Sequence, residues 1–309
     1  MSDVLKNINI GVIGNGFVGA SVSSGFRHYC KSLKIFDKDQ KRSTHTIEEV
    51  FNADIVFVCV PTPMSLSGSA DLSAIENVFN EANEKKAKCS FVIKSTVPVG
   101  TTDDLSSKYP SLNIFHSPEF LTARAAKIDF ICPSRNIIGY PSKTDCENKS
   151  SECFEKLNII KDYFKIRFPG VQCLTMKSKE SEMVKYIANC FFATKVSFFN
   201  EMYLLSEKLN LDWEKVIGGV LSDGRIGISH FQVPGHDGDM GFGGTCFPKD
   251  INSLISIMKD NDINPLILQA AWDRNLSVRK NKDWEYEAAA VSKPKNKELD
   301  RKLEKIMKN

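Results

Sequence analysis

Short runs of almost entirely apolar residues recur through the first half of the chain, and segments with helical spacing separate them. Five runs read as strands, at residues 8–13, 33–36, 55–60, 90–93 and 113–115. Three intervening segments read as helices, at residues 17–29, 72–86 and 102–108. Strands that are apolar on both faces and alternate with helices indicate a parallel sheet covered on both sides. We therefore predict an α/β fold with a Rossmann-type, doubly wound parallel sheet.

The second half of the chain predicts helices only. Residues 177–209 contain neither Gly nor Pro, and apolar side chains recur every three or four positions, at Met183, Ile187, Phe191, Thr194, Phe198, Met202, Leu205 and Leu209. This spacing predicts one long amphipathic helix with that stripe as its main face. Further apolar residues beside the stripe indicate a second packed side, at Phe192, Val196 and Phe199. Shorter helices are expected at residues 213–221, 248–259 and 265–277.

A length of 309 residues suggests two domains. We place a Rossmann-like domain at residues 1–174 and an all-helical central domain at residues 175–278. Residues 279–309 form a basic C-terminal tail, which we expect to be mobile or loosely helical after Trp284 because large apolar residues become rare there.

The charge balance and the apolar runs exclude two classes of partner. The 41 Lys and Arg residues exceed the 38 Asp and Glu residues by only three, and that excess lies in the basic tail, which argues against a nucleic-acid partner. The longest apolar run, residues 55–60, is too short to cross a bilayer, and no leader-like segment precedes the first strand. We expect no membrane partner.

The nine cysteines do not form a recognisable pattern. Their number is odd, no C-x-x-C pair occurs, and the five histidines supply no matching ligand spacing, so we expect neither a metal site nor a disulfide framework. Such usage fits reduced thiols in a cytoplasmic protein.

A glycine-rich motif follows the first predicted strand and opens the first predicted helix. It reads Gly14-Asn15-Gly16-Phe17-Val18-Gly19, and Asp37 ends the second strand 18 residues later. In this setting the glycines allow a tight turn, close approach of a pyrophosphate and packing of the helix on the strand. Asp37 can accept hydrogen bonds from ribose hydroxyls and would repel a 2′-phosphate. We therefore predict NAD as the cofactor, although Lys38 and Lys41 leave NADP open.

A second motif, residues 243–250, contains the one cysteine whose neighbours predict reactivity. Pro248 suits the first position of a helix, which puts Cys246 at or just before the N-cap. A helix N-terminus stabilises a thiolate, and Lys249 adds positive charge. The alternative is a small residue at a crowded helix start.

Two polar residues of the long helix share one face. Lys185 and Asn189 are four positions apart, which places them one helical turn apart. The pair alone does not identify a site, because lysines on helices are usually solvated. We interpret Lys179, Glu180 and Glu182 as solvated surface.

Together these strings resemble the nucleotide-sugar (UDP-glucose/GDP-mannose) dehydrogenase family. The resemblance covers residues 8–255 and depends on seven strings in order, at residues 60–63, 95–101, 117–121, 185–189, 195–201, 225–227 and 241–250. It implies oxidation of the C6 alcohol of a nucleotide sugar to a carboxylate with NAD, through a thiohemiacetal and a thioester on Cys246.

The resemblance also implies roles for individual residues. Catalysis falls to Cys246, Lys185, Asn189, Asp250, Thr96 and Glu119. The cofactor is held by the residues of the glycine motif and Asp37, together with Pro61, Thr62, Thr96 and Lys249. The substrate is held by Glu119, Phe120, Leu121, Lys185, Asn189, Arg225, Gly243 and Cys246. Arg225 is expected to reach a substrate in a neighbouring subunit, because the family implies a homodimer through the long helix.

The substrate stays open at this point. UDP-glucose, giving UDP-glucuronate, is the first expectation, and UDP-N-acetylmannosamine, GDP-mannose or a non-catalytic partner subunit are the alternatives. Ala123 stands where many relatives have a second Glu, and the resemblance implies that this replacement either changes sugar selectivity or slows a proton transfer. The chain resembles a short form without the C-terminal nucleotide-binding domain, and the loop at residues 225–246, longer than in common relatives, either takes over part of that binding or is only a longer surface loop.

Overall fold

The computed structural model describes residues 7–122, 124–142, 146–148 and 150–294, and the chain divides into two compact units. The first unit comprises Met1–Thr62 and Leu72–Lys185, and the second comprises Pro63–Asp71 and Tyr186–Asn309. Ala123 and residues 295–309 of the predicted tail lie outside the described residues.

The first unit contains a seven-stranded sheet with the strand order β2-β1-β3-β4-β5-β6-β7. The strands are β1 (Asn9–Ile13), β2 (Ser32–Phe36), β3 (Ile55–Val58), β4 (Ser90–Ile93), β5 (Asn113–His116), β6 (Asn136–Tyr140) and β7 (Cys173–Lys177). The predicted doubly wound fold is confirmed, and all five predicted strands are present. Neighbouring strands are parallel except β5 and β6, which pair antiparallel. The sheet is therefore mostly, not wholly, parallel, and the sequence analysis did not predict β6 and β7.

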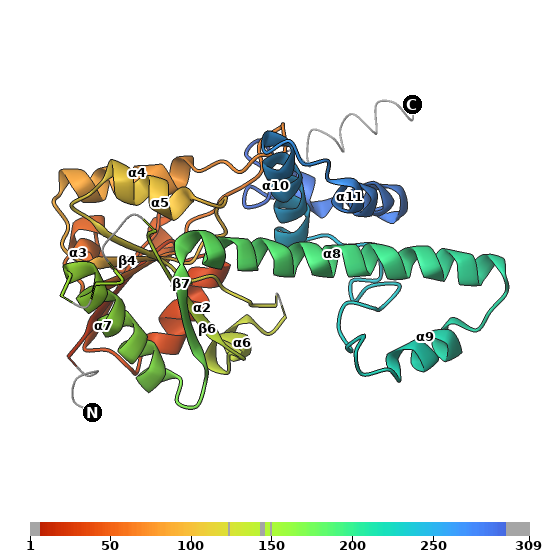
Figure 1. The fold of residues 1–309 in the computed structure, drawn as a ribbon, viewed down its shortest axis with the longest axis horizontal. Coiled ribbons are helices and arrows are strands. Elements are labelled where there is room, and N and C mark those ends of the chain that lie inside the picture. The colour runs from red at the N-terminus through yellow and green to blue at the C-terminus, as the bar shows by residue number, and fades with distance from the viewer. Residues whose placement is uncertain (1–6, 123, 143–145, 149, 295–309) are drawn as a thin grey trace. The chain divides into compact units, whose positions relative to one another are not determined.

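Helices cover both faces of this sheet, as Figure 1 shows. One core is formed with α3 (Ile47–Phe51), α4 (Ser73–Glu84) and α5 (Thr101–Lys108). The other is formed with α2 (Phe17–Phe26), α6 (Ala126–Ile131) and α7 (Glu152–Arg167). Alternate residues of each central strand face opposite cores, because side chains along a strand point to opposite sides. In β3, for example, Val56 and Val58 enter the first core, and Ile55 and Phe57 enter the second.

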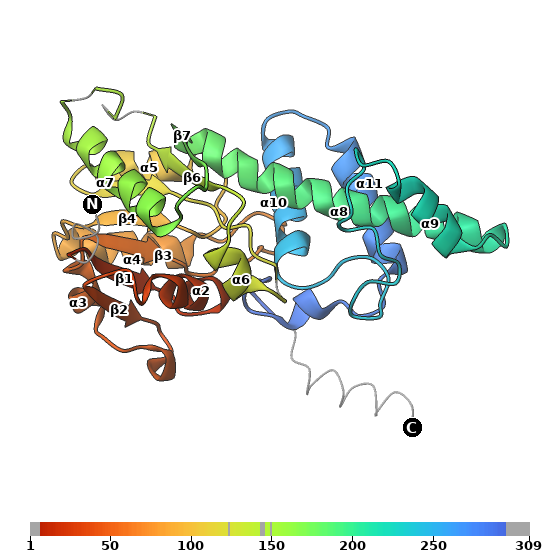
Figure 2. The same cartoon turned by 90° about the horizontal axis from the view of Figure 1, so that it is seen from below.

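The second unit is helical, as predicted (Figure 2). The helix α8 (Ser178–Lys208) begins in the first unit and continues into the second, which also contains α9 (Trp213–Leu221), α10 (Cys246–Asp260) and α11 (Leu266–Val278). A 3-10 turn follows at Asp283–Tyr286. Beyond Trp284, where we expected little fixed structure, Ala290 is buried and Val291 forms a β-bridge with Met64.

The apolar stripe that we interpreted as the main packed face of α8 is largely exposed. Its exposed members are Met183, Ile187, Phe191, Phe198, Leu205 and Leu209. The buried side contains Tyr186, Cys190, Ala193 and Phe199 instead. Because both sides of the helix carry apolar residues, spacing alone could not determine which side packs in the core.

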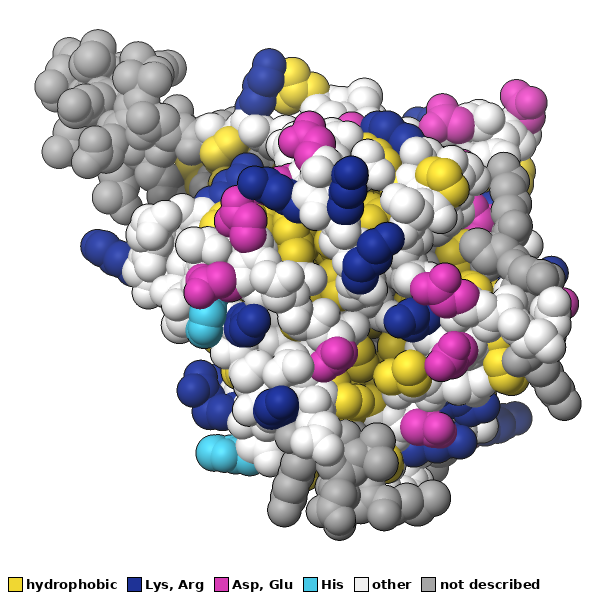
Figure 3. Space-filling view, turned by 90° about the vertical axis from the view of Figure 1, so that its left-hand side faces the viewer, with side chains coloured by type: hydrophobic (Ala, Val, Ile, Leu, Met, Phe, Trp, Pro, Cys, Tyr) yellow, Lys and Arg dark blue, Asp and Glu magenta, His cyan; other side chains and the backbone are white. Residues whose placement is uncertain are grey.

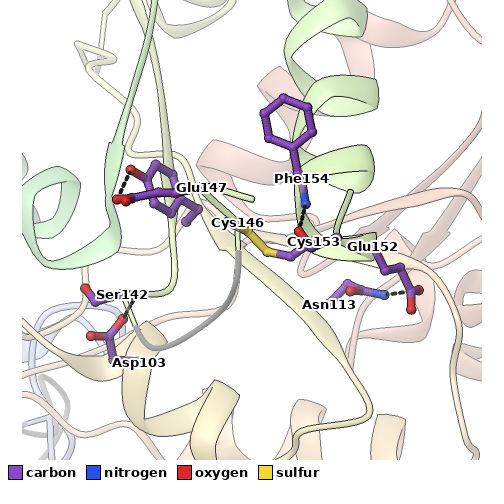
Figure 4. Close-up of a disulfide and its surroundings, with 10 residues drawn as sticks. Asp103, Asn113, Ser142, Cys146, Glu147, Glu152, Cys153 and Phe154 are labelled. Carbon is purple, nitrogen blue, oxygen red and sulfur yellow. Dashed lines mark hydrogen bonds between the residues drawn. A yellow bond between two sulfur atoms is a disulfide. The ribbon is translucent and has the colours of Figure 1, made fainter. Parts of the chain in front are cut away.

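The structure contains one feature that the cysteine pattern did not predict. Cys146 and Cys153 form a disulfide beside the start of α7, where the Ser151 hydroxyl accepts a hydrogen bond from the Phe154 amide (Figure 4). The expectation that the cysteines are all reduced is wrong for this pair. The seven-residue separation carries no recognised spacing, and the chain turn before α7 brings the two Cα atoms to 4.8 Å.

Charged side chains of both signs are mixed on the surface. On the face of the first unit seen in Figure 3, Lys and Arg side chains are interspersed with Asp and Glu. Within the described ranges, no helix combines the length and the apolar character that crossing a membrane requires.

Candidate active site

The glycine motif adopts the geometry that a bound pyrophosphate requires. Gly14 has φ +87°, and a Cβ atom there would lie 2.7 Å from the Cys59 carbonyl oxygen. A Cβ atom on Gly19 would lie 1.8 Å from the Gly14 oxygen, so the helix can approach the strand only at a glycine. A Cβ atom on Gly16 would meet nothing within 4 Å, which leaves the backbone open to a ligand. The turn therefore fits a dinucleotide at the N-terminus of α2, which no side chain caps.

The exposed side chain of Phe17 and the partly buried side chain of Val18 form the first turn of this helix. They complete the predicted phosphate turn.

Asp37 lies beside that turn and is almost buried. Its Oδ2 accepts a hydrogen bond from the Asn15 amide at 2.6 Å, and its Oδ1 accepts one from the Asp39 amide at 2.8 Å. Each oxygen keeps a second lone pair, so two ribose hydroxyls can still be bound. The cation near this carboxylate is Arg42, whose Nε lies 3.7 Å from Oδ1, and the sequence analysis had considered Lys38 and Lys41 instead.

The loops after β3 and β4 are joined at the same edge of the sheet. The Thr62 hydroxyl donates to the Thr96 carbonyl at 2.7 Å, and both residues are buried. Pro61, just before Thr62, is exposed. Because β1, β3 and β4 are parallel neighbours, their carboxyl ends bring these loops and the glycine motif to one edge, where Rossmann-type folds bind ligands.

Glu119 and Lys185 form a buried ion pair in the first unit. The Lys185 Nζ lies 2.9 Å from Glu119 Oε1 and also donates to the Glu119 carbonyl at 2.7 Å. The second carboxylate oxygen accepts from the Leu121 amide at 2.6 Å. Burial raises the pKa of Glu119, but the nearby Lys185 ammonium and the Leu121 amide outweigh it and lower the pKa overall. The ring of Phe120 lies 5.5 Å from the Lys185 ammonium.

Lys94 is a functional candidate that the sequence analysis missed. Its buried Nζ donates to the Ser117 hydroxyl and to the Pro118 carbonyl, each at 3.2 Å. Burial, with a contribution from Lys185, lowers the pKa of Lys94 to about 8, although Glu119 acts in the opposite direction. A lysine placed directly after the all-apolar strand β4 was the available signal.

Glu182 is fully buried, so its interpretation as solvated surface is wrong. Its carboxylate accepts hydrogen bonds from the Gly100 amide at 2.6 Å, the Thr102 amide at 2.9 Å and the Thr102 hydroxyl at 2.6 Å. These bonds link α8 to the start of α5. Glu182 lies three residues before Lys185 on α8, so the link is close to the ion pair in sequence. Burial raises the pKa of Glu182 to about 7, although these donors favour the charged form.

In the second unit, Asp250 is a buried carboxylate with two polar partners. The Asn189 amide donates to its Oδ2 at 2.6 Å, and the Lys249 ammonium donates to its Oδ1. The Cys190 thiol contacts the Asp250 carbonyl oxygen at 3.7 Å. Asn189 from one predicted string therefore lies beside Lys249 and Asp250 from another.

Cys246 is the first residue of the 15-residue helix α10, which begins two residues earlier than the Pro248 start that we predicted. Its Sγ lies 3.8 Å from the Thr245 hydroxyl, and the side chain is partly exposed. Positive partial charge at a helix N-terminus stabilises a thiolate. Asp250 follows four residues later, so it shares this face of the helix.

The remaining predicted substrate residues lie in loops. Gly243 is partly buried, and a Cβ atom there would lie 2.3 Å from the Arg279 Nη2. Arg225 is exposed and pairs with Asp223. Among the described residues, no cluster of three or more His, Cys, Asp or Glu side chains has an arrangement that could hold a metal ion.

Family models and known proteins are similar to this chain in sequence and in fold. The NAD binding domain model of the UDP-glucose/GDP-mannose dehydrogenase family matches residues 39–158, and the central domain model of that family matches residues 179–277. The UDP-glucose 6-dehydrogenase of Rickettsia bellii is 36% identical over 241 residues, which cover 76% of this chain and 51% of the relative. The Pseudomonas aeruginosa enzyme of the same name is 31% identical, covering 85% of this chain and 64% of the relative.

A solved structure supports the same relationship. The UDP-glucose dehydrogenase of the hyperthermophilic archaeon Pyrobaculum islandicum superimposes with a TM-score of 0.75 at 28% identity, covering 88% of this chain and 68% of that one. The chain spans about half the length of several curated relatives that it matches. The two family models lie in the two halves of the chain in their expected order. The chain therefore belongs to the UDP-glucose/GDP-mannose dehydrogenase family, and its first unit contains the NAD-binding domain of that family.

Proposed function

We propose that this chain is an NAD-dependent nucleotide-sugar 6-dehydrogenase that oxidises UDP-glucose to UDP-glucuronate. The observation that carries the proposal is Cys246 at the first residue of α10, one turn before a buried Asp250 that Asn189 holds. This arrangement suits a nucleophile that needs a base and an oxyanion donor nearby. The names of the curated relatives favour UDP-glucose over other nucleotide sugars.

In the first oxidation, the C6 alcohol passes its hydroxyl proton to a water molecule and releases a hydride from C6, which gives the aldehyde. NAD, when bound, accepts the hydride. Lys185 donates a hydrogen bond to the oxygen that develops negative charge, and Glu119 keeps the lysine charged and oriented. Thr96 lies at the sheet edge beside the glycine motif, where it can position the sugar or a water molecule.

In the second oxidation, the Cys246 thiolate adds to the aldehyde carbon and gives a thiohemiacetal. Loss of a second hydride from that carbon gives a thioester on Cys246, and Asn189 donates to the oxyanions. Water then attacks the thioester, Asp250 takes up the proton of the water, and cleavage of the C–S bond releases the carboxylate and the thiolate. Two hydrides leave for each sugar oxidised.

The proposal includes NAD rather than NADP, because the Asp37 carboxylate would repel a 2′-phosphate. Lys249 is the further cofactor contact, on the helix that begins with Cys246. A cytoplasmic location is part of the same proposal, since Cys246 acts as a reduced thiol.

We also propose a homodimer through α8. Five large apolar side chains of this helix are exposed in the single chain, at Met183, Ile187, Phe191, Phe198 and Leu205. An exposed apolar patch of this kind is typical of a protein–protein interface. A second copy of the same helix offers a matching apolar surface around a twofold axis. Arg225, on an exposed loop, would then reach the substrate of the partner.

The test of this assembly is the mass of the protein in solution. A monomeric mass at micromolar concentration, or an unchanged dimer in Phe191→Asp, contradicts this assembly.

The test is NADH formation against UDP-glucose, UDP-N-acetylmannosamine and GDP-mannose, with NADH counted per sugar consumed. We expect two NADH per UDP-glucose and much slower turnover of the other sugars. Turnover of another sugar alone would correct the substrate. Absence of NADH with every sugar, although NAD and UDP-glucose bind, would instead support a non-catalytic partner subunit.

A further inference from the structure

The loop that leads to Cys246 is held by side chains that accept hydrogen bonds from three of its backbone amides, those of Gly241, Phe242 and Gly244. The Gly241 amide donates to Asn200 Oδ1 at 2.9 Å. The Phe242 amide donates to Asn275 Oδ1 at 2.7 Å, and Asn275 Nδ2 donates back to the Phe242 carbonyl at 3.0 Å. The Gly244 amide donates to the Asp283 carboxylate at 3.0 Å. Every one of these contacts lies within the second unit.

Arg279 packs behind the same loop. Its side chain is 1% exposed, its Nη2 lies 2.6 Å from Asp237 Oδ2, and its Nε donates to the Asn281 carbonyl at 2.9 Å. Asp283 Oδ2 lies 3.7 Å from the same Nη2. The guanidinium occupies the space that a side chain at Gly243 would need, so the glycine backbone rests directly on it.

This network is poorly explained as a contribution to stability alone. Three carboxylates surround one guanidinium, and an arginine buried among charged partners is weak evidence for net stabilisation. Hydrogen bonding from Arg279 and from nearby amides nevertheless outweighs burial and keeps the pKa of Asp237 below its usual range. The contacts converge on the loop, and the last of them, at Gly244, ends two residues before Cys246.

We propose that Asn275, Arg279 and Asp283 form a clamp that positions the Cys246 thiol at the N-terminus of α10. They act as positioning residues, because Asn275 and Asp283 bond to the backbone of residues 242–244 and Arg279 packs against Gly243. The clamp deepens the proposed function, since it assigns a purpose to residues of α11 and of the segment that we interpreted as a basic tail.

The clamp acts through the helix N-terminus. The first turn of α10 stabilises a thiolate only while Cys246 keeps its place at the first helical position. Asp283 holds the Gly244 amide just before that position. Without Asp283, the loop gains conformational freedom, the thiol spends time away from the helix end, and the thiolate form is less favoured.

The experiment measures the thiol itself, so it does not depend on dehydrogenase activity. The rate at which iodoacetamide alkylates Cys246 in the full chain is followed by peptide mass spectrometry from pH 6 to pH 10, without substrate. In Asp283→Ala we expect about tenfold slower alkylation at pH 7 and a pH profile displaced to higher pH. A change of this size corresponds to a partial loss of the stabilisation that the helix N-terminus gives to the thiolate. Asp283→Asn should restore much of the rate, because its amide oxygen can still accept from Gly244.

Arg274→Ala is the matched control. Arg274 lies on α11 beside Asn275, and it pairs with Glu201 rather than with the loop. Its removal should therefore leave the alkylation profile unchanged. An unchanged profile in Asp283→Ala, or equal slowing in Arg274→Ala, would overturn the clamp. If Asp283→Ala does not fold, Asn275→Ala decides instead, because it removes the two hydrogen bonds to the Phe242 backbone. An unchanged alkylation profile in Asn275→Ala would then count against the clamp. The wild type could oxidise no sugar while the clamp variants are alkylated slowly. That combination would support the clamp and refute only the proposed function.

Discussion

The two units both bury a carboxylate beside a lysine, but they position these groups in different ways. In the first unit, Glu119 and Lys94 follow the ends of β5 and β4, so the order of the sheet places them. In the second unit, the approach to Cys246 is fixed by Asn275 and Asp283, which lie 33 and 39 residues from their loop partners. Chemistry in the first unit therefore follows from topology, whereas chemistry in the second depends on a few distant side chains.

The charge around the two carboxylates also differs. Two lysines, Lys94 and Lys185, lie near Glu119, which leaves the first cluster with an excess of positive charge. Asp250 has one lysine and one neutral amide, so its cluster is balanced. A positive cluster suits stabilisation of an alkoxide, and a balanced one suits a group that takes up and releases a proton.

Replacing the proposed nucleophile in the second unit, Cys246, should have the largest effect. In Cys246→Ser, formation of two NADH per sugar should fall at least about a thousandfold, because a serine hydroxyl is a far weaker nucleophile at neutral pH. The first oxidation needs no covalent bond, so some NAD reduction can survive. The measurements are steady-state turnover and a mass spectrum of the protein after incubation with substrate and NAD.

Two comparisons sharpen that result. Cys246→Ala should bind sugar and NAD but form no adduct, and Cys190→Ser, at a buried thiol outside the proposed chemistry, should cost stability rather than turnover. Near-normal production of two NADH per sugar by Cys246→Ser would show that the thiol is not the nucleophile.

Breaking the ion pair of the first unit should affect both activity and stability. Lys185→Met leaves Glu119 buried without its close cation, and breaking a buried pair costs about 3–5 kcal/mol. We expect turnover to fall by about two to three orders of magnitude, as when an oxyanion donor is lost. Chemical unfolding and turnover provide the two readouts. Lys179→Met, at an exposed position of the same helix, is the control, and equal losses in both variants would remove Lys185 from the proposed chemistry.

The cofactor turn offers a smaller, more specific test. In Asp37→Ala, the preference for NAD over NADP should fall by about tenfold, since a ribose hydroxyl loses a charged acceptor worth about 1.5–3 kcal/mol. Asp37→Asn retains acceptor oxygen for the Asn15 amide, so it separates loss of charge from loss of loop structure. The ratio of kcat/KM for NAD and NADP is the measurement. Equal or better turnover with NADP in the unmutated protein would contradict the assignment.

The sequence was most informative where contacts are local or repeat with the period of the sheet. The apolar runs predicted the five strands, and spacing predicted α8 to within a residue at each end. The strand β7 was missed because its mixed and only partly buried sequence resembles a loop. The strand β6 was missed although its three central residues are buried. Lys94 and Glu182 could have been found, since one directly follows an all-apolar strand and the other precedes Lys185 by three helical positions.

Other features depend on contacts that no local pattern specifies. Arg279 looked like part of a basic tail, and only the folded chain brings it to Asp237, 42 residues away. The packed side of α8 was likewise undecidable from spacing, because the buried side includes polar residues such as Ser197 and Asn200 that bond to distant partners. The functional strings were recognised through family resemblance, but the residues that position them were not.

The last effect that we predict concerns Lys94, and it is a dependence of the free energy of unfolding on pH. Burial lowers the pKa of Lys94 to about 8, whereas an unfolded lysine titrates near pH 10.4, a difference of about 3 kcal/mol in the stability of the charged form. Between these pH values the unfolded chain holds a proton that the folded chain has lost, so this residue makes the free energy of unfolding rise with pH. Below pH 8 both states hold the proton, and the full cost of burying the ammonium remains.

Lys94→Met removes this dependence. The variant should therefore gain stability relative to the wild type at pH 7, and that gain should shrink by about 3 kcal/mol as the pH approaches 10.4, measured by urea unfolding of both proteins at pH 7, 8.5 and 10. Lys215→Met, at a side chain that is 85% exposed, should show no such trend. If the difference between Lys94→Met and the wild type were constant from pH 7 to pH 10, Lys94 would not be a buried ammonium. The first cluster would then hold one charged lysine, Lys185, against one carboxylate, Glu119, and its charge would be as balanced as that of the cluster around Asp250.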